Sequence, residues 1–304
     1  MSHVLPLLRA CPILNNTEIE FLRIKPMRKI PFKDVEEEIL TLVKYQENEP
    51  KNPYILDLKN RKQELFLYGC KHSRNIRNKQ FKQIEGQFND FLRRNRNSAI
   101  IIEGPRPDIL SKEELVRKYT EGGFVFYLSH RKGIKVHEIE PSWDQLLGFA
   151  IKRNSKISVA SWILLNTLNN RIKAGSKFDK KSVAHIKSLL TSINEKLHFS
   201  KADHPFEEIS IYLNDVAGKV ILPKNSMELM GFNLNPQYIF KLQDPFSSKT
   251  AVNKVGTDIN LGRDYFLSKN ILKVLESGKS VFCVLGLNHV FCTKKVFKNF
   301  FQKK

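Results

Sequence analysis

Two histidines of this chain follow the same short pattern, in which a glycine stands three residues before the histidine. Gly69 precedes His72 at the end of one apolar run, and Gly286 precedes His289 at the end of another. A neutral imidazole takes a proton from water or binds a metal ion near neutral pH. Glycine lets the backbone turn sharply and approach a ligand closely. The repeated pattern marks His72 and His289 as candidate site residues.

Two carboxylates stand at equivalent places along the chain. Glu103 follows the apolar run 99–102, and Glu140 follows the run 134–139. Ligands of open α/β sheets bind at the carboxyl ends of the strands, so we expect both carboxylates to meet the histidines at one edge. Two histidines and a glutamate are adequate for activating water, and equally adequate for holding a metal ion or a cofactor.

The apolar pattern predicts the elements that must position these residues. Runs 54–58 and 64–68 around a polar turn predict a hairpin, and runs 99–102, 134–139 and 280–285 predict further strands. Helices are predicted at 77–95 and 112–132, the latter with a junction at Glu121-Gly122-Gly123, because glycine costs about 1 kcal/mol inside a helix. This alternation predicts an α/β fold with a mostly parallel central sheet, an N-terminal hairpin and flanking helices.

The rest of the chain has less chemistry. Residues 1–50 are predicted to be a leader segment with a short amphipathic helix at 34–45, and residues 51–304 one α/β domain with a helical insertion at about 143–217. Residues 219–249 are predicted to be irregular. A helix is predicted at 263–277, where Asp264 would suit the first turn through the helix dipole. Arg263 beside it has a planar fork that suits an anionic substrate group.

The net charge of +20, from 51 basic and 31 acidic residues, is the unusual feature of the composition. It indicates either a nucleic-acid or anionic-surface partner or a broadly solvated basic surface. The densest basic stretches are 74–82, 93–96, 177–181 and 294–304. Because no nucleic-acid-binding signature accompanies them, we favour the solvated surface.

The cysteines indicate a reducing compartment. Cys11, Cys70, Cys283 and Cys292 form no C-x-x-C pair, and the last three lie in or beside apolar runs, where free thiols behave as small buried hydrophobes. We recognise no signal peptide, and no apolar run has the length of a membrane span. The sequence therefore predicts a cytoplasmic protein.

Several of these segments resemble a known group of proteins. The segment 54–73 with its Gly-x-x-His, the Ile-Ile-Glu-Gly of 101–104 and the closing Gly-x-x-His of 286–289 resemble the TraB/PrgY/Tiki group. Segments 121–123, 140–142 and 263–265 look like motifs of the wider superfamily of erythromycin esterases and ChaN-like haem-binding proteins. The resemblance covers roughly residues 54–291 and is strong only at the strand ends.

The resemblance implies a catalytic or ligand-binding centre. By carry-over, His72 and His289 would bind a divalent metal of unidentified kind or activate water, and Glu103 would be a metal ligand or a base. The residues expected to line the substrate pocket are Glu121, Glu140, Arg263 and Asp264. We recognise no secretion signal or membrane anchor like those of Tiki proteins, which argues against an extracellular protease role. Its middle, 155–242, carries no recognised motif.

Three functions stay open from the sequence. The first is a metal- or histidine-dependent hydrolase of a small-molecule or peptide substrate with an ester, lactone, amide or peptide bond. The second is a non-catalytic haem or metal binder on the same scaffold, in which Tyr68 and Tyr127 join the histidines. The third is a basic protein that binds nucleic acid or another polyanion.

Overall fold

The computed structural model describes residues 32–302, apart from 109, 176–177, 201–204 and 248. The described residues divide into two compact units, one within residues 32–146 and 259–302 and the other within 147–258. Most of the predicted leader, with Cys11, lies outside the described residues. Cys70, Cys283 and Cys292 are buried free thiols, as predicted.

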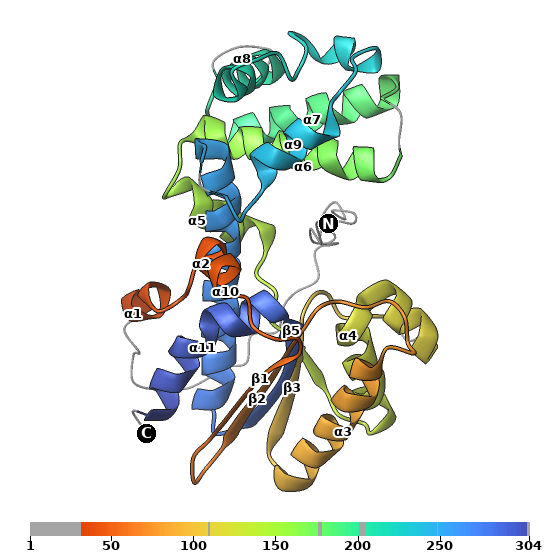
Figure 1. Ribbon diagram of the computed structural model, residues 1–304, viewed down its shortest axis with the longest axis vertical. Coiled ribbons are helices and arrows are strands. Elements are labelled where there is room, and N and C mark those ends of the chain that lie inside the picture. The colour runs from red at the N-terminus through yellow and green to blue at the C-terminus, as the bar shows by residue number, and fades with distance from the viewer. Residues whose placement is uncertain (1–31, 109, 176–177, 201–204, 248, 303–304) are drawn as a thin grey trace. The chain divides into compact units, whose positions relative to one another are not determined.

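A five-stranded sheet forms the first unit within the described residues (Figure 1). The strands are β1 (Tyr54–Lys59), β2 (Glu64–Cys70), β3 (Ser98–Ile102), β4 (Val136–Glu138) and β5 (Ser280–Gly286). Their order is β1-β2-β5-β3-β4, with β1 antiparallel to β2 and the remaining pairs parallel. The predicted α/β fold with a mostly parallel sheet and an N-terminal hairpin is confirmed.

The last strand of the chain lies in the middle of the sheet. β5 pairs with β2 on one side, where Cys70 aligns with Gly286, and with β3 on the other, where Ile102 aligns with Val284. All seven residues of β5 are buried, as expected for a strand covered on both faces. The carboxyl ends of β2 and β3 therefore flank the carboxyl end of β5, at a point where the strand order leaves a crevice for ligands in such sheets.

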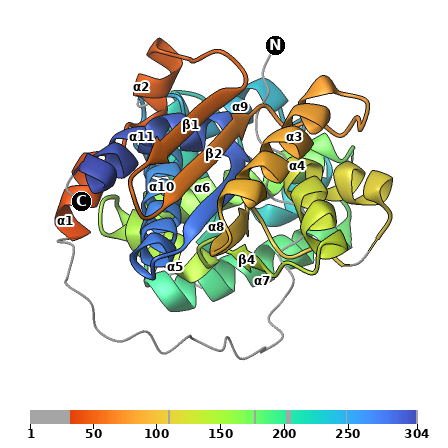
Figure 2. The same ribbon diagram turned by 90° about the horizontal axis from the view of Figure 1, so that it is seen from below.

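Helices cover both faces of this sheet (Figures 1 and 2). On one face lie α3 (Lys79–Arg94) and α4 (Lys112–Arg131), and on the other lie α11 (Leu287–Gln302) and the C-terminal part of α10 (Ala251–Glu276). The apolar side of α3 is buried in a cluster with alternate residues of the strands. Phe282 of β5 stacks on Phe66 and meets the edge of Phe88, with ring centroids 5.4 Å apart in both pairs. This packing fixes the strand ends that carry the polar residues.

Two predicted elements differ in the structure. The helix expected at 34–45 is two short helices, α1 (Phe32–Glu37) and α2 (Leu42–Glu47), and Thr41 caps the second by accepting a hydrogen bond from the Lys44 amide. The helix expected to begin at Arg263 begins at Ala251. A Cβ on Gly256 would lie 2.9 Å from Nε1 of Trp162 in another helix, so this glycine lets the two helices pack closely.

The second unit is helical. Its elements are α6 (Lys156–Lys173), α7 (Lys180–Leu197), α8 (Pro205–Ala217), the 3-10 helix η1 (Ser226–Met230) and α9 (Pro236–Gln243), with the adjoining parts of α5 (Trp143–Ile151) and α10. The stretch 219–249, predicted to be irregular, thus contains two helical segments. Within the described residues, none of the helices combines the length and apolar character that crossing a membrane requires.

Candidate active site

Residues that follow four strands meet in the sheet unit. His72 follows β2, Glu103 follows β3 and Glu140 follows β4, while His289 lies in the first turn of α11 directly after β5. Oε1 of Glu103 lies 4.0 Å from Nε2 of His72 and 3.7 Å from Nε2 of His289. The convergence expected from the sequence is therefore present, with Glu103 between the two imidazoles.

The first imidazole is held by a buried carboxylate. Nδ1 of His72 lies 2.9 Å from Oε2 of Glu121, whose side chain is 1% exposed, whereas that of His72 is 26% exposed. Since Glu121 accepts the proton on Nδ1, Nε2 carries the free electron pair and points toward Glu103. Burial lowers the pKa of His72, but the hydrogen bond to Glu121 and the charge of Glu103 outweigh it and raise the pKa above the ordinary value.

A kink inside α4 brings Glu121 to this position. Thr120 has φ 52° and ψ −132° within the helix, a strained conformation for a β-branched residue. A Cβ on Gly123 would lie 2.4 Å from the carbonyl oxygen of Leu115, and one on Gly122 would lie 3.0 Å from that of Glu103. The junction predicted from the glycines is confirmed, and both glycines permit close backbone contacts there.

Glu121 also accepts hydrogen bonds from the segment that follows His72. The backbone amide of Ser73 donates to Oε1 at 2.7 Å, and Nε2 of Gln80 donates to the same oxygen at 2.5 Å. Both carboxylate oxygens are therefore occupied, which fixes the carboxylate and, through it, the His72 ring.

The second imidazole is fully buried and differently bonded. Nδ1 of His289 hydrogen-bonds Asp264, and Nη1 of Arg263 lies 3.1 Å from Nε2 of His289. The His289 and Asp264 side chains are 1% and 2% exposed. Burial raises the pKa of Asp264, against the opposing effects of His289 and Arg263. The prediction that Asp264 serves the first turn of a helix is wrong, because it lies within α10 and bonds His289.

Arg263 lies among carboxylates. Its Nη2 donates to Oε1 of Glu103 at 2.8 Å, and its Nε and Nη2 donate to the two oxygens of Glu140 at 2.5 and 3.0 Å. Four of its five N–H donors are thus directed at protein partners, so the role expected from the sequence, binding an anionic substrate group, stays a prediction. Burial raises the pKa of Glu103, but the charges of Arg263, His289 and His72 and the amide of Gly286 outweigh it and lower it to about 2.

Gly286 lets three polar side chains approach its backbone closely. A Cβ at this position would lie 3.0 Å from Oδ1 of Asn288, 3.2 Å from Cδ2 of His289 and 3.5 Å from Nε2 of His72. A side chain at this position would therefore crowd both imidazoles. The Gly286 amide meanwhile donates to Oε2 of Glu103 at 2.6 Å.

Two polar residues at the site were not predicted from the sequence. Gln80 lies in the helix after His72, and only tertiary folding brings it to Glu121. Asn288 lies inside the second Gly-x-x-His pattern, so its position in the sequence could have marked it as a site residue. It is half-buried, and its Oδ1 lies close to Gly286.

The expected metal ligands do not suit a divalent ion as they are arranged. Arg263 contacts both Oε1 of Glu103 and Nε2 of His289, so its positive charge already stands where a metal would bind those atoms. In the described part of the chain, no group of three or more His, Cys, Asp or Glu side chains is arranged to hold a metal ion. The alternative haem contact Tyr68 is 1% exposed in the core, and its hydroxyl donates to Gln83, while Tyr127 packs at the edge of the core cluster.

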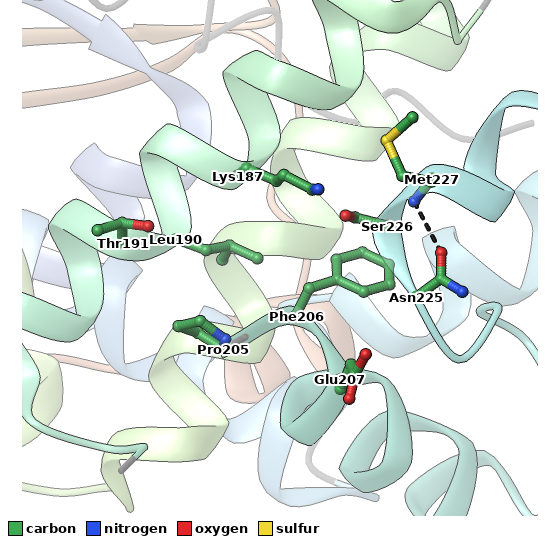
Figure 3. A pocket seen from close by; sticks show the side chains of 9 residues that line it. All are labelled: Lys187, Leu190, Thr191, Pro205, Phe206, Glu207, Asn225, Ser226 and Met227. Carbon is green, nitrogen blue, oxygen red and sulfur yellow. Dashed lines mark hydrogen bonds between the residues drawn. The ribbon is translucent and has the colours of Figure 1, made fainter. Parts of the chain in front are cut away.

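A pocket of about 420 Å³ lies elsewhere, in the helical unit (Figure 3). Its wall combines the apolar side chains of Leu190, Phe206 and Met227 with the polar ones of Lys187 and Ser226. None of the residues predicted from the sequence lines it, and it contains no histidine.

Comparison with known proteins adds no relative: no protein-family model, curated protein or solved structure matches the chain.

Proposed function

We propose that this protein is a hydrolase of ester, lactone, amide or peptide bonds in which His72 activates the attacking water. The observation that carries the proposal is the state of the His72 ring. Its Nδ1 is bound by the buried carboxylate of Glu121, while its Nε2 makes no hydrogen bond within the described residues and the ring is part-exposed. A base held by a third group, with its second nitrogen open, is the arrangement that general-base catalysis needs.

The proposed reaction begins with a water molecule hydrogen-bonded to Nε2 of His72. The water attacks the carbonyl carbon of the substrate while Nε2 takes its proton, and a tetrahedral oxyanion forms. The resulting imidazolium is stabilised by Glu121 at Nδ1 and by Glu103, 4.0 Å from Nε2. The same imidazolium then gives its proton to the leaving group as the tetrahedral intermediate collapses.

The other site residues have supporting roles in this proposal. His289 is a weaker candidate for the base, because both of its nitrogens are engaged, by Asp264 and by Arg263. Glu103 accepts hydrogen bonds on both oxygens and stays ionised, so it acts through its charge. The amide of Asn288, which lies beside Gly286, is the side chain we expect to donate to the oxyanion.

We also propose that the chain belongs to the superfamily of TraB-like proteins, erythromycin esterases and ChaN-like proteins. The support is positional. The two Gly-x-x-His patterns and the glutamate between them, which carry the resemblance, stand at the carboxyl ends of adjacent parallel strands.

Measured hydrolysis tests the proposed function. The purified protein is screened against panels of esters, lactones and peptides, and His72→Ala is expected to lower kcat by about 10²–10⁴-fold. His130→Ala is the matched control, because His130 is an exposed histidine at the end of α4. Activity that survives both His72→Ala and His289→Ala would contradict the proposal.

A further inference from the structure

The segment after His72 is a loop that runs into the first turn of α3, and both ends of this segment bind one carboxylate oxygen. We call residues 73–80 the basic loop. Its first residue, Ser73, donates its backbone amide to Oε1 of Glu121, and its last, Gln80, donates its side-chain amide to the same atom. Gln80 also donates to the carbonyl oxygen of Lys71 at 3.3 Å. The basic loop is therefore hydrogen-bonded to Glu121, the residue that also binds the His72 ring.

The loop presents positive charge without compensation. Arg74, Arg77 and Lys79 are all exposed, and the sequence from residue 71 to residue 84 contains no Asp or Glu. Among the described residues, none of these three side chains has an ion-pair partner. At the other end of α3, by contrast, Arg93 pairs with Asp90, and Arg94 pairs with Glu64 at 2.6 Å.

The site beside the basic loop is, in contrast, lined by negatively charged side chains. Glu103, Glu121 and Glu140 line it, and among the described residues the buried guanidinium is that of Arg263, which carboxylates occupy. An anionic group of a substrate would therefore meet mainly carboxylates at the site itself. The basic loop offers it cations, because Arg74 follows His72 by two residues and their Cα atoms are at most about 7 Å apart.

We propose that the basic loop binds an anionic group, phosphate or carboxylate, of the substrate whose acyl bond is cleaved at His72. This inference rests on the proposed function and names the substrate class for the same site. Two arginine forks and a lysine suit the oxygens of such a group. The substrate is then a small molecule with an uncharged scissile acyl group and an anionic group a few bonds away.

A pair of substrates tests the inference. Two esters share the same acyl and leaving groups, and one carries a phosphate at the far end of the acyl chain. The double variant Arg74→Gln/Arg77→Gln is expected to raise KM for the phosphorylated ester at least about tenfold, with kcat nearly unchanged and the neutral ester unaffected. The control Arg93→Gln/Arg96→Gln removes two charges from the far end of α3, about 24 Å away, and should change neither substrate.

Direct binding separates the failure of the inference from that of the proposed function. Inorganic tripolyphosphate is titrated into the wild type, both double variants and His72→Ala, and only Arg74→Gln/Arg77→Gln should lose binding. If the wild type cleaves neither ester but this binding pattern holds, the proposed hydrolysis is wrong and the anion site stands.

Three outcomes would overturn the inference itself. The first is equal cleavage of both esters with no binding of tripolyphosphate, and the second is the same loss in the control variant. The third is displacement of tripolyphosphate by a DNA oligonucleotide at far lower concentration, which would assign the basic loop to a nucleic acid.

Discussion

The two histidines are equivalent in sequence pattern but differ in what their second nitrogen contacts. Nε2 of His289 lies 3.1 Å from Arg263 in a fully buried position, whereas Nε2 of His72 has no bonded partner among the described residues and its ring is part-exposed. An imidazole must have a free nitrogen to take a proton from water. We therefore assign the base to His72 and a positioning role to His289.

The pH dependence of hydrolysis tests the assignment of His72. Since the pKa of His72 is raised, its neutral base form becomes the major form only at a pH above the ordinary pKa of about 6.5. The value of kcat should therefore rise with pH through a midpoint above 6.5. Glu121→Gln weakens the hydrogen bond to Nδ1 and removes a neighbouring negative charge, both of which raise the pKa of His72. We expect the midpoint to move to lower pH and the plateau rate to fall at least about tenfold. An unchanged midpoint in a kcat–pH profile would contradict this role of Glu121.

Glu103 makes a separate prediction about stability. Its folded pKa of about 2 lies below its unfolded value, so its ionised form stabilises the fold above roughly pH 4.3, and this contribution is lost as the pH falls toward 2. The difference in unfolding free energy between wild type and Glu103→Gln should therefore be largest near neutral pH and shrink in acid. Urea unfolding at pH 7, 4 and 2.5 measures it, and a constant difference across this range would contradict it.

At the scale of elements, the kink of α4 places Glu121, and the position of β5 places His289. The kink depends on Gly123, because any side chain there meets the backbone of Leu115. Gly86 of α3 provides the contrast, since a Cβ there meets nothing within 4 Å. A side chain is therefore sterically excluded at Gly123 of α4 but has room at Gly86 of α3.

Alanine at each of these glycines separates the two cases. Gly123→Ala should lower the free energy of unfolding by about 2 kcal/mol or more, because the helix junction must open, and it should lower activity by displacing Glu121. Gly86→Ala should raise stability by up to about 1 kcal/mol through helix propensity. Urea denaturation of both variants checks the signs, and equal effects would show that the kink does not depend on Gly123.

At the scale of the whole molecule, a chain of net charge +20 contains a site lined mainly by carboxylates. Arg263 is buried and donates to two of these carboxylates, Glu103 and Glu140. We expect its guanidinium to serve at this site in place of a metal ion.

Chelation tests this view of the whole protein. After incubation with EDTA and dialysis, we expect the melting temperature and the rate of hydrolysis to stay unchanged, because Arg263 already contacts the atoms of Glu103 and His289 that a metal ion would bind. A loss of activity that Zn²⁺ or Mg²⁺ restores would contradict it, and would mean that a metal ion displaces the guanidinium.

The sequence by itself determined the local features. Continuous apolar runs identified the strands, the spacing of apolar residues identified α3, and the paired glycines identified the junction in α4. The polar residues at strand ends were visible as well, because an α/β sheet brings its carboxyl ends to one edge. These features depend only on neighbours within a few residues, so periodicity shows them.

Only the tertiary structure decided how these pieces meet. Strand order is set by packing between distant segments, and it placed β5 between β2 and β3, so that Glu103 lies between the two imidazoles. The partners of Arg263 and the bond from Gln80 to Glu121 join residues far apart in the chain. No local pattern encodes such contacts, because they depend on which buried charges and donors must be satisfied once the core has formed.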